Sequence, residues 1–269
     1  MIQSLTCKDK KIGRKIYICN INNGSELVNI LKREIVITAD GSSTIRLCEE
    51  DECYHSVNGA LAESLHIFIN NGLNSFLNEK RASVEPIHKC ISILEIGLGT
   101  GLNCVLTAIE ALKHKDLIFN YIALEKYPVT VQELKCLNYE IFLGRDYNSI
   151  LEKIHSVQWG VSEKILNNFN LTKIERDIKE LEGDSLKGVI SNVDIVYFDA
   201  FSPNIQPELW SREIFKGLFS MMSGGSILIT YSSRGSVKIA LRESGFTVKR
   251  LKGPSGKRHI TLATRPDTF

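Results

Sequence analysis

An apolar run that ends in three closely spaced glycines constrains the fold more than any other stretch of this chain. Residues 93–96 are Ile-Leu-Glu-Ile, and Gly97, Gly99 and Gly101 follow at alternate positions, ahead of apolar residues at helical spacing. A strand, a glycine loop and a helix in this order predict the ligand-binding corner of a doubly wound α/β sheet. Glycines let the backbone approach a ligand there, beside the free N–H groups of the first helical turn. The alternative is a purely structural turn.

The acidic residue before this loop indicates which cofactor it binds. The loop reads G-x-G-x-G after Glu95, whereas the loops of nicotinamide enzymes read G-x-G-x-x-G. A carboxylate is a poor neighbour for a pyrophosphate but a good one for a positive charge. We therefore expect S-adenosylmethionine, whose amino group and sulfonium are cationic. The predicted contacts in this segment are Glu95, Gly97, Gly99, Thr100, Gly101 and Asn103.

After residue 89 the chain alternates strands with helices. Strands are expected at 91–96, 117–124, 172–181, 193–198 and 226–231, with helices from 102, 128, 207 and 236. The last two strands, 246–248 and 259–264, form a hairpin, and a helix is expected on either side of Trp159-Gly160. The predicted fold is α/β, a class I methyltransferase: a Rossmann-like, mostly parallel sheet of seven strands with a C-terminal antiparallel β-hairpin.

The preceding residues predict a small N-terminal β/α extension. Asp40-Gly41 forms the turn of a hairpin between Ile35 and Leu47. Residues 58–77 indicate a helix with Leu61, Leu65, Phe68 and Ile69 on one face. We therefore divide the chain into an extension, 1–88, and a methyltransferase domain, 89–269, and find no usable motif in residues 1–30.

Three acidic residues follow predicted strands, at the edge where ligands bind in an open parallel sheet. Glu125 lies 24 residues beyond Gly101, close to the spacing at which an acid binds ribose hydroxyls. Asp184 is expected to meet the adenine amino group. The alternatives are a solvated helix cap for Glu125 and a turn aspartate for Asp184. The third acid is Asp199.

Asp199 is the predicted catalytic residue and a further cofactor contact. Phe198-Asp199-Ala200-Phe201-Ser202-Pro203 has the ingredients, though not the sequence, of the (D/N)-P-P-(Y/F) loop of adenine amino-methyltransferases. A carboxylate suits a substrate amine that arrives as a cation and must lose a proton before it attacks. Phe201 is expected to pack on a flat base. The alternative makes Asp199 a helix N-cap before Pro207.

Composition excludes several classes of protein. No stretch approaches the roughly 20 apolar residues of a membrane span. The polar start from Met1 to Lys15 lacks the apolar core of a secretion signal, so we expect a cytoplasmic protein. The seven cysteines are odd in number and include no C-x-x-C pair, which indicates reduced thiols and no metal site.

Positive charge is concentrated near the C-terminus although the net charge is only +2. We expect Arg250, Lys252, Lys257 and Arg258 to flank one loop, to lie at the opposite end of the sheet from the cofactor, and to bind RNA phosphates. The alternative is a solvated face.

Several segments together resemble one family. These are residues 96–103, 198–203, Pro207-Glu208-Leu209-Trp210 and Gly256-Lys257-Arg258-His259, with Asp40-Gly41-Ser42-Ser43-Thr44 and residues 58–64 upstream. In this order they resemble the methyltransferase part of the tRNA-modifying MnmC family, over about residues 35–265. Ala60 and Ala200 depart from the family pattern without removing a functional group.

The resemblance implies an activity. Members of this family use S-adenosylmethionine to methylate the exocyclic amine of 5-aminomethyl-(2-thio)uridine at the tRNA wobble position, so tRNA, held by its anticodon loop, is the expected partner. Because the sequence ends at Phe269, without an FAD-dependent oxidase, we expect a stand-alone methyltransferase. Two rivals remain: an aminopropyltransferase-like enzyme that alkylates small amines, and a non-catalytic RNA-binding module with a degenerate cofactor loop.

Overall fold

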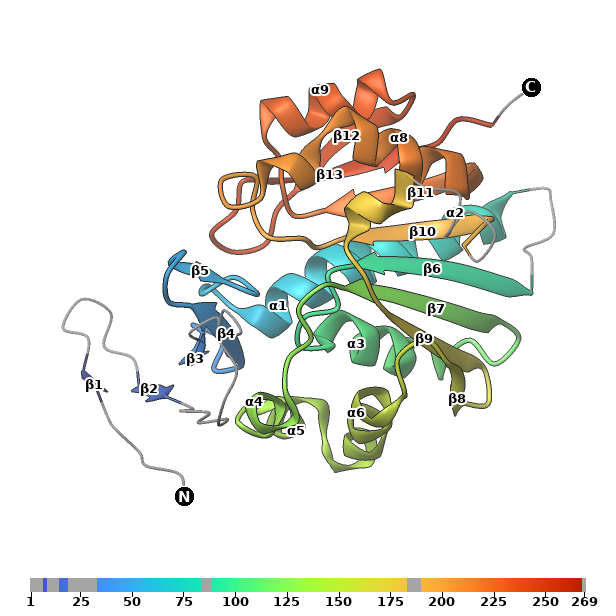
Figure 1. Cartoon of the computed structure of the whole chain (residues 1–269). Coiled ribbons are helices and arrows are strands. Elements are labelled where there is room, and N and C mark those ends of the chain that lie inside the picture. Colours follow the sequence, from blue (N-terminus) through green and yellow to red (C-terminus); the bar gives the residue numbers. More distant parts are fainter. Residues whose placement is uncertain (1–6, 9–14, 19–32, 84–88, 183–189, 268–269) are drawn as a thin grey trace.

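The protein is built around one large twisted sheet with a smaller sheet beside it (Figure 1). The computed structural model describes residues 7–8, 15–18, 33–83, 89–182 and 190–267. The large sheet has eight strands in the order β12-β13-β11-β10-β6-β7-β9-β8. Its strands are β6 (Cys90–Ile96), β7 (Ile118–Glu125), β8 (Ser162–Leu166), β9 (Phe169–Glu175), β10 (Val193–Phe198), β11 (Met222–Thr230), β12 (Thr247–Lys252) and β13 (His259–Thr264).

The strand pairing confirms the predicted methyltransferase topology. Strands β11, β10, β6, β7 and β9 run parallel, and the C-terminal hairpin β12–β13 joins β11 antiparallel. The helices among these strands are α3 (Leu102–Ala111), α4 (Val131–Lys135), α5 (Tyr139–Leu143), α6 (Arg145–Ser156), α8 (Arg212–Met221) and α9 (Gly235–Glu243), with short 3₁₀ turns η2 (Ile178–Glu182) and η3 (Pro207–Trp210).

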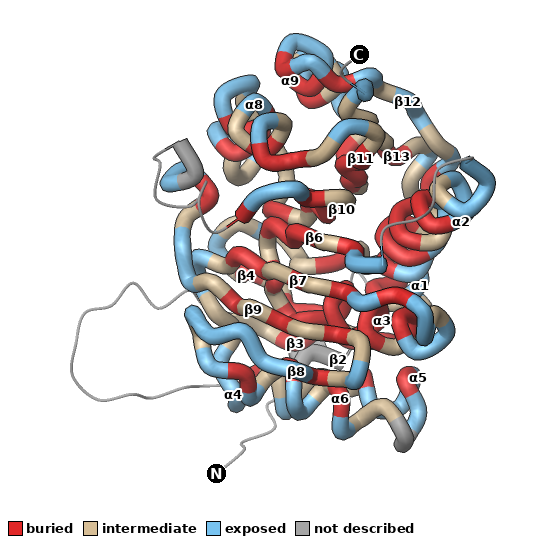
Figure 2. The backbone as a smooth tube through the Cα atoms, turned by 90° about the vertical axis from the view of Figure 1, so that its right-hand side faces the viewer, coloured by how far each residue is buried: buried red, intermediate tan, exposed pale blue. Residues whose placement is uncertain are grey.

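Side chains that point alternately to the two faces of the central strands form two apolar cores. On β6, Ile91 and Ile93 belong to the core that includes α3, whereas Leu94 and Ile96 belong to the core under α8 and α9. This is the two-residue period of a strand that is covered on both faces. Figure 2 shows that burial is concentrated along the central strands and the helices packed on them.

The eighth strand corrects the prediction of seven. A helix was expected after Trp159-Gly160, but the chain forms β8 and pairs antiparallel with β9. The predicted strand 172–181 was placed too late, because the alternating burial begins at Phe169 and residues 178–182 form η2. Asn168, in the turn between β8 and β9, donates to the carbonyl of Ala111 at 2.8 Å and so helps to close the end of α3.

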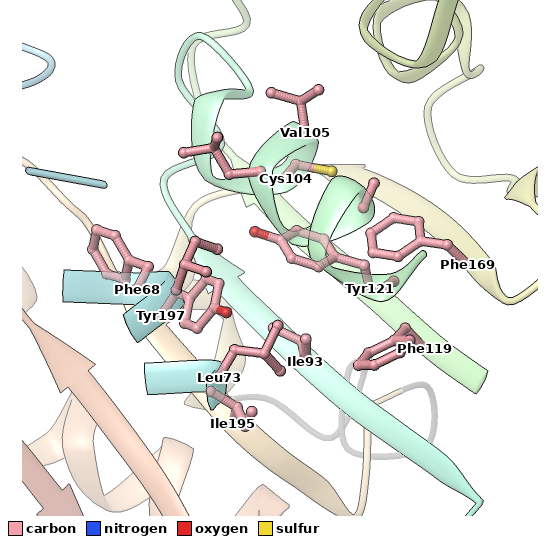
Figure 3. Packing of buried hydrophobic residues seen from close by; sticks show 14 of the residues in the cluster. Phe68, Leu73, Ile93, Cys104, Val105, Phe119, Tyr121, Phe169, Ile195 and Tyr197 are labelled. Carbon is pink, nitrogen blue, oxygen red and sulfur yellow. The ribbon is translucent and has the colours of Figure 1, made fainter. Parts of the chain in front are cut away.

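The helix expected over residues 58–77 runs from 60 to 82 in three pieces. These are α1 (Ala60–Ser64), the π-helix η1 (Leu65–Asn74) and α2 (Ser75–Ala82). The expected apolar face is partly wrong. Phe68 and Ile69 are buried, but Leu65 is exposed, because π-helical winding does not follow the spacing of an α-helix. Figure 3 shows Phe68 and Leu73 beside Tyr197 of the large sheet.

The smaller sheet has the order β1-β2-β3-β4-β5 and contains the predicted hairpin. Its strands are β1 (Cys7–Lys8), β2 (Lys15–Ile18), β3 (Arg33–Ile37), β4 (Ser43–Leu47) and β5 (Glu52–Cys53). The hairpin turn closes the start of α1, since the Asp40 carboxylate accepts from the N–H of Ala62 at 2.9 Å and from the N–H of Ser42 at 3.0 Å. The Asp40-Gly41-Ser42 signature therefore has a structural role. The boundary at residue 88 stays a prediction.

Two contacts attach β3 and β4 to the region after β7. The side chains of Arg33 and Glu133, both nearly buried, form an ion pair at 3.2 Å. The N–H of Ser43 donates to the side-chain oxygen of Asn138 at 2.7 Å. These contacts hold the smaller sheet against the edge of the large sheet where β7 ends. Within the described ranges, every helix is too short or too polar to cross a membrane.

Candidate active site

A cavity of about 300 Å³ lies where strands β6, β7 and β10 end. Residues from both parts of the chain line it. The segment 51–57 and Glu63 form one side, and residues that follow the parallel strands form the other. The residues that matter below are Tyr54, His55, Glu63, Gly97, Gly99, Glu125, Asp199, Phe201, Tyr231 and Lys257. The cavity therefore lies at the carboxyl-end edge of the sheet, where the site was expected; its function stays a prediction.

Two loop glycines are required by close contacts with other parts of the wall. Gly97 has φ +89°, and a Cβ there would lie 2.7 Å from the carbonyl oxygen of Asp199. Gly99 has φ +50°, and a Cβ would lie 2.8 Å from the ring of Tyr54. Both residues line the cavity. Gly101 instead lies against the ring of His155, so the lack of a side chain there allows His155 to pack beneath the loop.

Glu125 ends β7 and holds the glycine loop in place. One carboxylate oxygen accepts from the N–H of Gly99 at 2.9 Å, and the other accepts from the N–H of Tyr127 at 2.8 Å. The residue lines the cavity, and the following helix α4 is capped by Thr130, so Glu125 is not a helix cap. The predicted contact between Glu125 and the ribose hydroxyls is consistent with this position and stays a prediction.

Three other predicted cofactor residues lie behind the cavity wall. Glu95 and Thr100 are fully buried, and Asn103 is 2 % exposed. The hydroxyl of Thr100 is 2.8 Å from that of Tyr139. The amide of Asn103 donates to Glu95 at 3.0 Å and to Asp199 at 2.8 Å. These side chains support the cavity wall instead of lining it.

Burial changes the chemistry expected of Glu95. Desolvation, and then the nearby carboxylate of Asp199, raise its pKa well above the usual value. Glu95 is enclosed and does not line the cavity, so its predicted contact with the cofactor is not direct in this structure and stays a prediction.

Asp199 follows β10 and faces the cavity. Burial and the carboxylate of Glu63 raise its pKa to about 7, against the opposing effects of the Asn103 hydrogen bond and the Lys257 ammonium. The 3₁₀ turn after it begins at Gln206 and α8 is capped by Ser211, so the helix-cap alternative is wrong. A carboxyl group with this pKa in a cavity is suited to accept a proton near neutral pH.

Phe201 lines the cavity two residues further on. Its ring meets the ring of Tyr54 edge to face, with centroids 5.0 Å apart and an interplanar angle of 83°. The Trp210 indole donates to the carbonyl oxygen of Phe201 at 2.9 Å, which fixes the loop. Two aromatic side chains from different parts of the chain therefore form one wall, as a flat base requires.

Sequence reasoning missed the residues that the smaller sheet and α1 contribute. Tyr54, His55 and Glu63 line the cavity, and Tyr231 joins them from the end of β11. Burial lowers the pKa of His55 to about 4. The only sequence signal was the resemblance of residues 58–64 to a family signature, which includes Glu63 but gives it no role.

The four predicted RNA-binding residues do not form one group. Arg250, Lys252 and Arg258 are exposed, whereas the ammonium of Lys257 lies in the cavity wall, 2.5 Å from Glu63 and 4.1 Å from the centre of the Tyr231 ring. The expectation that this segment lies far from the cofactor site is wrong. Strand β13 runs antiparallel to β11, so the loop before it returns to the carboxyl-end edge. Asp184 lies outside the described residues.

The charges in this wall fit a cationic cofactor. Five carboxyl groups, those of Asp51, Glu52, Glu63, Glu125 and Asp199, share the lining with the two ammonium groups of Lys126 and Lys257. Glu125, Gly97 and Gly99, which are predicted to hold S-adenosylmethionine, line this cavity. No cluster of metal-ligating side chains occurs in the described parts of the chain.

Residues 142–266 match a family model described as S-adenosyl-L-methionine-dependent methyltransferase. The sheet order, the C-terminal hairpin and the cavity at the strand ends agree with that match. The chain is a class I methyltransferase whose cofactor is S-adenosylmethionine.

Within this class, the comparisons confirm the resemblance to MnmC. The chain is 30% identical over 224 residues to the tRNA 5-methylaminomethyl-2-thiouridine biosynthesis bifunctional protein MnmC of Cupriavidus necator, covering 80% of this chain and 32% of that protein. It spans about a third of the length of the curated relatives it matches. The structure of MnmC2 from Aquifex aeolicus matches with a TM-score of 0.68 and 26% identity, covering 88% of this chain and 72% of that one.

A spermidine synthase from Thermotoga maritima has the same fold. Its TM-score is 0.52 with 14% identity, over 91% of this chain and 73% of that one. This likeness concerns the fold alone. The aminopropyltransferase alternative is not favoured, since the MnmC2 structure is more similar in both fold and sequence.

Proposed function

We propose that this chain methylates the exocyclic amine of 5-aminomethyl-(2-thio)uridine at the wobble position of tRNA, acting on the anticodon loop in the cytoplasm. The observation that carries the proposal is the Asp199 carboxyl group, held by Asn103 in a cavity that also presents the rings of Phe201 and Tyr54. Similarity to MnmC, whose name specifies the methylated product 5-methylaminomethyl-2-thiouridine, supports the choice of substrate.

Asp199 acts on the amine before methyl transfer. The substrate ammonium gives one proton to the carboxylate, which leaves a nitrogen lone pair free and Asp199 neutral. The cofactor supplies an electrophilic methyl group. Phe201 and Tyr54, in contact with each other, form the wall against which the uracil ring packs, so that the amine stays in a fixed direction. After transfer, Asp199 releases its proton to solvent and is ready for another cycle.

Exposed basic residues near the cavity supply the affinity for tRNA. Arg250, Lys252 and Arg258 lie on β12 and on the loop that returns to the cavity edge. Their charges are free to meet backbone phosphates while a base enters the cavity. Lys257 does not belong to this group, because its ammonium lies in the cavity wall.

The test is the wobble nucleoside of a strain that lacks the gene. Mass spectrometry should find the aminomethyl form accumulating where the methylaminomethyl form is lost, and the wild-type gene should restore it. A gene for the Asp199→Asn variant should not. An unchanged nucleoside pattern in the deletion strain would refute the proposal.

A further inference from the structure

We propose that Glu63 and Lys257 are a positioning pair for Asp199. The ion pair fixes one positive and one negative charge in the cavity wall that Asp199 faces, and the balance between them decides whether Asp199 meets the substrate amine as a carboxylate. This inference rests on the proposed function in one respect, which is that Asp199 is the base.

A chain of contacts leads from α1 to the Asp199 loop. The Glu63 carboxylate accepts from the N–H of Ser56 at 2.7 Å and lies 2.5 Å from the ammonium of Lys257. That ammonium lies over the Tyr231 ring at 4.1 Å from its centre. The Tyr231 hydroxyl donates to the carbonyl oxygen of Ala200, next to Asp199, at 2.8 Å. The pair is therefore held at a fixed place relative to Asp199.

The arrangement differs from a surface ion pair. The side chain of Glu63 is 8 % exposed and that of Lys257 is 29 % exposed, so solvent screens their charges only in part. The ammonium also lies over the face of the Tyr231 ring, whose electrons attract a cation. Other side chains around Asp199 and this pair bear on the same equilibrium: Glu95 behind the wall, Asn103 on α3, Tyr231 directly after β11, and His55 beside the pair.

The two members of the pair act on Asp199 in opposite directions. Glu63 raises the pKa of Asp199, and Lys257 lowers it. Removing the ammonium leaves the Glu63 charge uncompensated, so Asp199 becomes harder to ionise. Removing the Glu63 charge leaves the ammonium uncompensated, so Asp199 becomes a weaker base.

A carbon-13 NMR titration of the Asp199 side-chain carboxyl measures this directly, without catalysis. The signal is assigned by its loss in Asp199→Asn. We expect Lys257→Met to move the midpoint to higher pH by about one unit and Glu63→Gln to move it to lower pH by a similar amount. Lys257→Arg keeps the charge and should titrate close to wild type. Shifts in the same direction, or none, would overturn the proposal.

A matched ion pair outside the cavity provides the control. Lys113, in the turn after α3, lies 2.7 Å from Glu110 on α3, and Lys113→Met makes the same change in net charge without moving the midpoint. If Glu63→Gln fails to fold, Lys257→Met alone tests the proposal, because the proposal requires that this variant move the Asp199 midpoint to higher pH.

Activity assays separate this inference from the proposed function. The pH at half-maximal kcat should shift with the NMR midpoint in both variants, while affinity for S-adenosylhomocysteine stays within about threefold. Absence of methyl transfer by the wild-type enzyme would refute the proposed function and leave the titration result standing. Methyl transfer that depends on Asp199, with unshifted profiles in both variants, would refute only the pair.

Discussion

The two sides of the cavity differ in how the chain builds them. The side formed by the parallel strands comes from short local patterns, an apolar strand followed at once by Gly97, Glu125 or Asp199. The other side comes from the segment 51–57 and Glu63, which reach the site only because the smaller sheet packs at this edge. If the proposed function holds, cofactor binding depends on local sequence, whereas the surroundings of the substrate amine depend on tertiary contacts.

The largest expected effect is a loss of turnover on substitution of Asp199, which faces both sides of the cavity. Asp199→Asn removes the proton acceptor but retains a similar shape, so kcat should fall by about 10²–10⁴-fold while cofactor affinity changes little. Single-turnover methyl transfer and calorimetry with S-adenosylhomocysteine measure the two quantities. Loss of cofactor affinity with unchanged turnover would show that Asp199 binds the cofactor and does not act on the amine.

The next effect concerns the cofactor side alone. Glu125→Ala removes a carboxylate that orders the N–H of Gly99 and is placed to bind ribose, so the Kd for S-adenosylmethionine should rise about 10–100-fold. Glu175→Ala is the matched control. Glu175 is paired in register with Glu125 on the neighbouring strand, and it is exposed. Equal losses in both variants would show that a general charge effect is responsible.

The other side of the cavity should be sensitive to acid. Burial lowers the pKa of His55 to about 4, below its unfolded value of about 6.5. The unfolded chain therefore binds more protons between these values, and stability is full above pH 6.5 and falls as the pH drops toward 4. At pH 5 this one group costs about 2 kcal/mol of unfolding free energy.

Urea unfolding of wild type and His55→Asn at pH 7 and pH 5 measures that contribution. The variant should lose less stability between the two pH values than the wild type does. His155, whose pKa burial also lowers to about 4, lies beneath the glycine loop and gives the comparison variant His155→Asn on the cofactor side. An identical pH dependence in wild type and His55→Asn would contradict the assignment.

The smallest expected effect is on tRNA affinity, and it concerns the basic residues outside the cavity, not Lys257 in its wall. Combined Arg250→Ala, Lys252→Ala and Arg258→Ala should weaken tRNA binding about tenfold and flatten its salt dependence by about 0.7 log units per lost phosphate contact. Lys113→Ala with Lys115→Ala, which removes exposed charge at the end of α3, should change neither. Unchanged tRNA affinity in the triple variant would mean that this segment is a solvated face.

The sequence was sufficient to predict the sheet, the glycine loop and the positions of Glu125 and Asp199, because each depends on a strand and the few residues after it. It did not predict β8, since the alternation that begins at Phe169 was read three residues late. The sequence also did not show that Lys257 and Arg258 have different surroundings. The pairing of β13 with β11 brings this loop to the cavity edge, where Lys257 lines the cavity and Arg258 is exposed. The burial of Glu95 was not predicted either, because it depends on the packing of α3 and β10 around it.

Methyl transfer in vitro tests the central claim most directly. Purified protein, S-adenosylmethionine and a tRNA that carries 5-aminomethyluridine at the wobble position should give one methyl group on the exocyclic nitrogen, identified by nucleoside mass spectrometry. Asp199→Asn should give almost none in the same time. Methylation at another atom, or full activity in Asp199→Asn, would contradict the account.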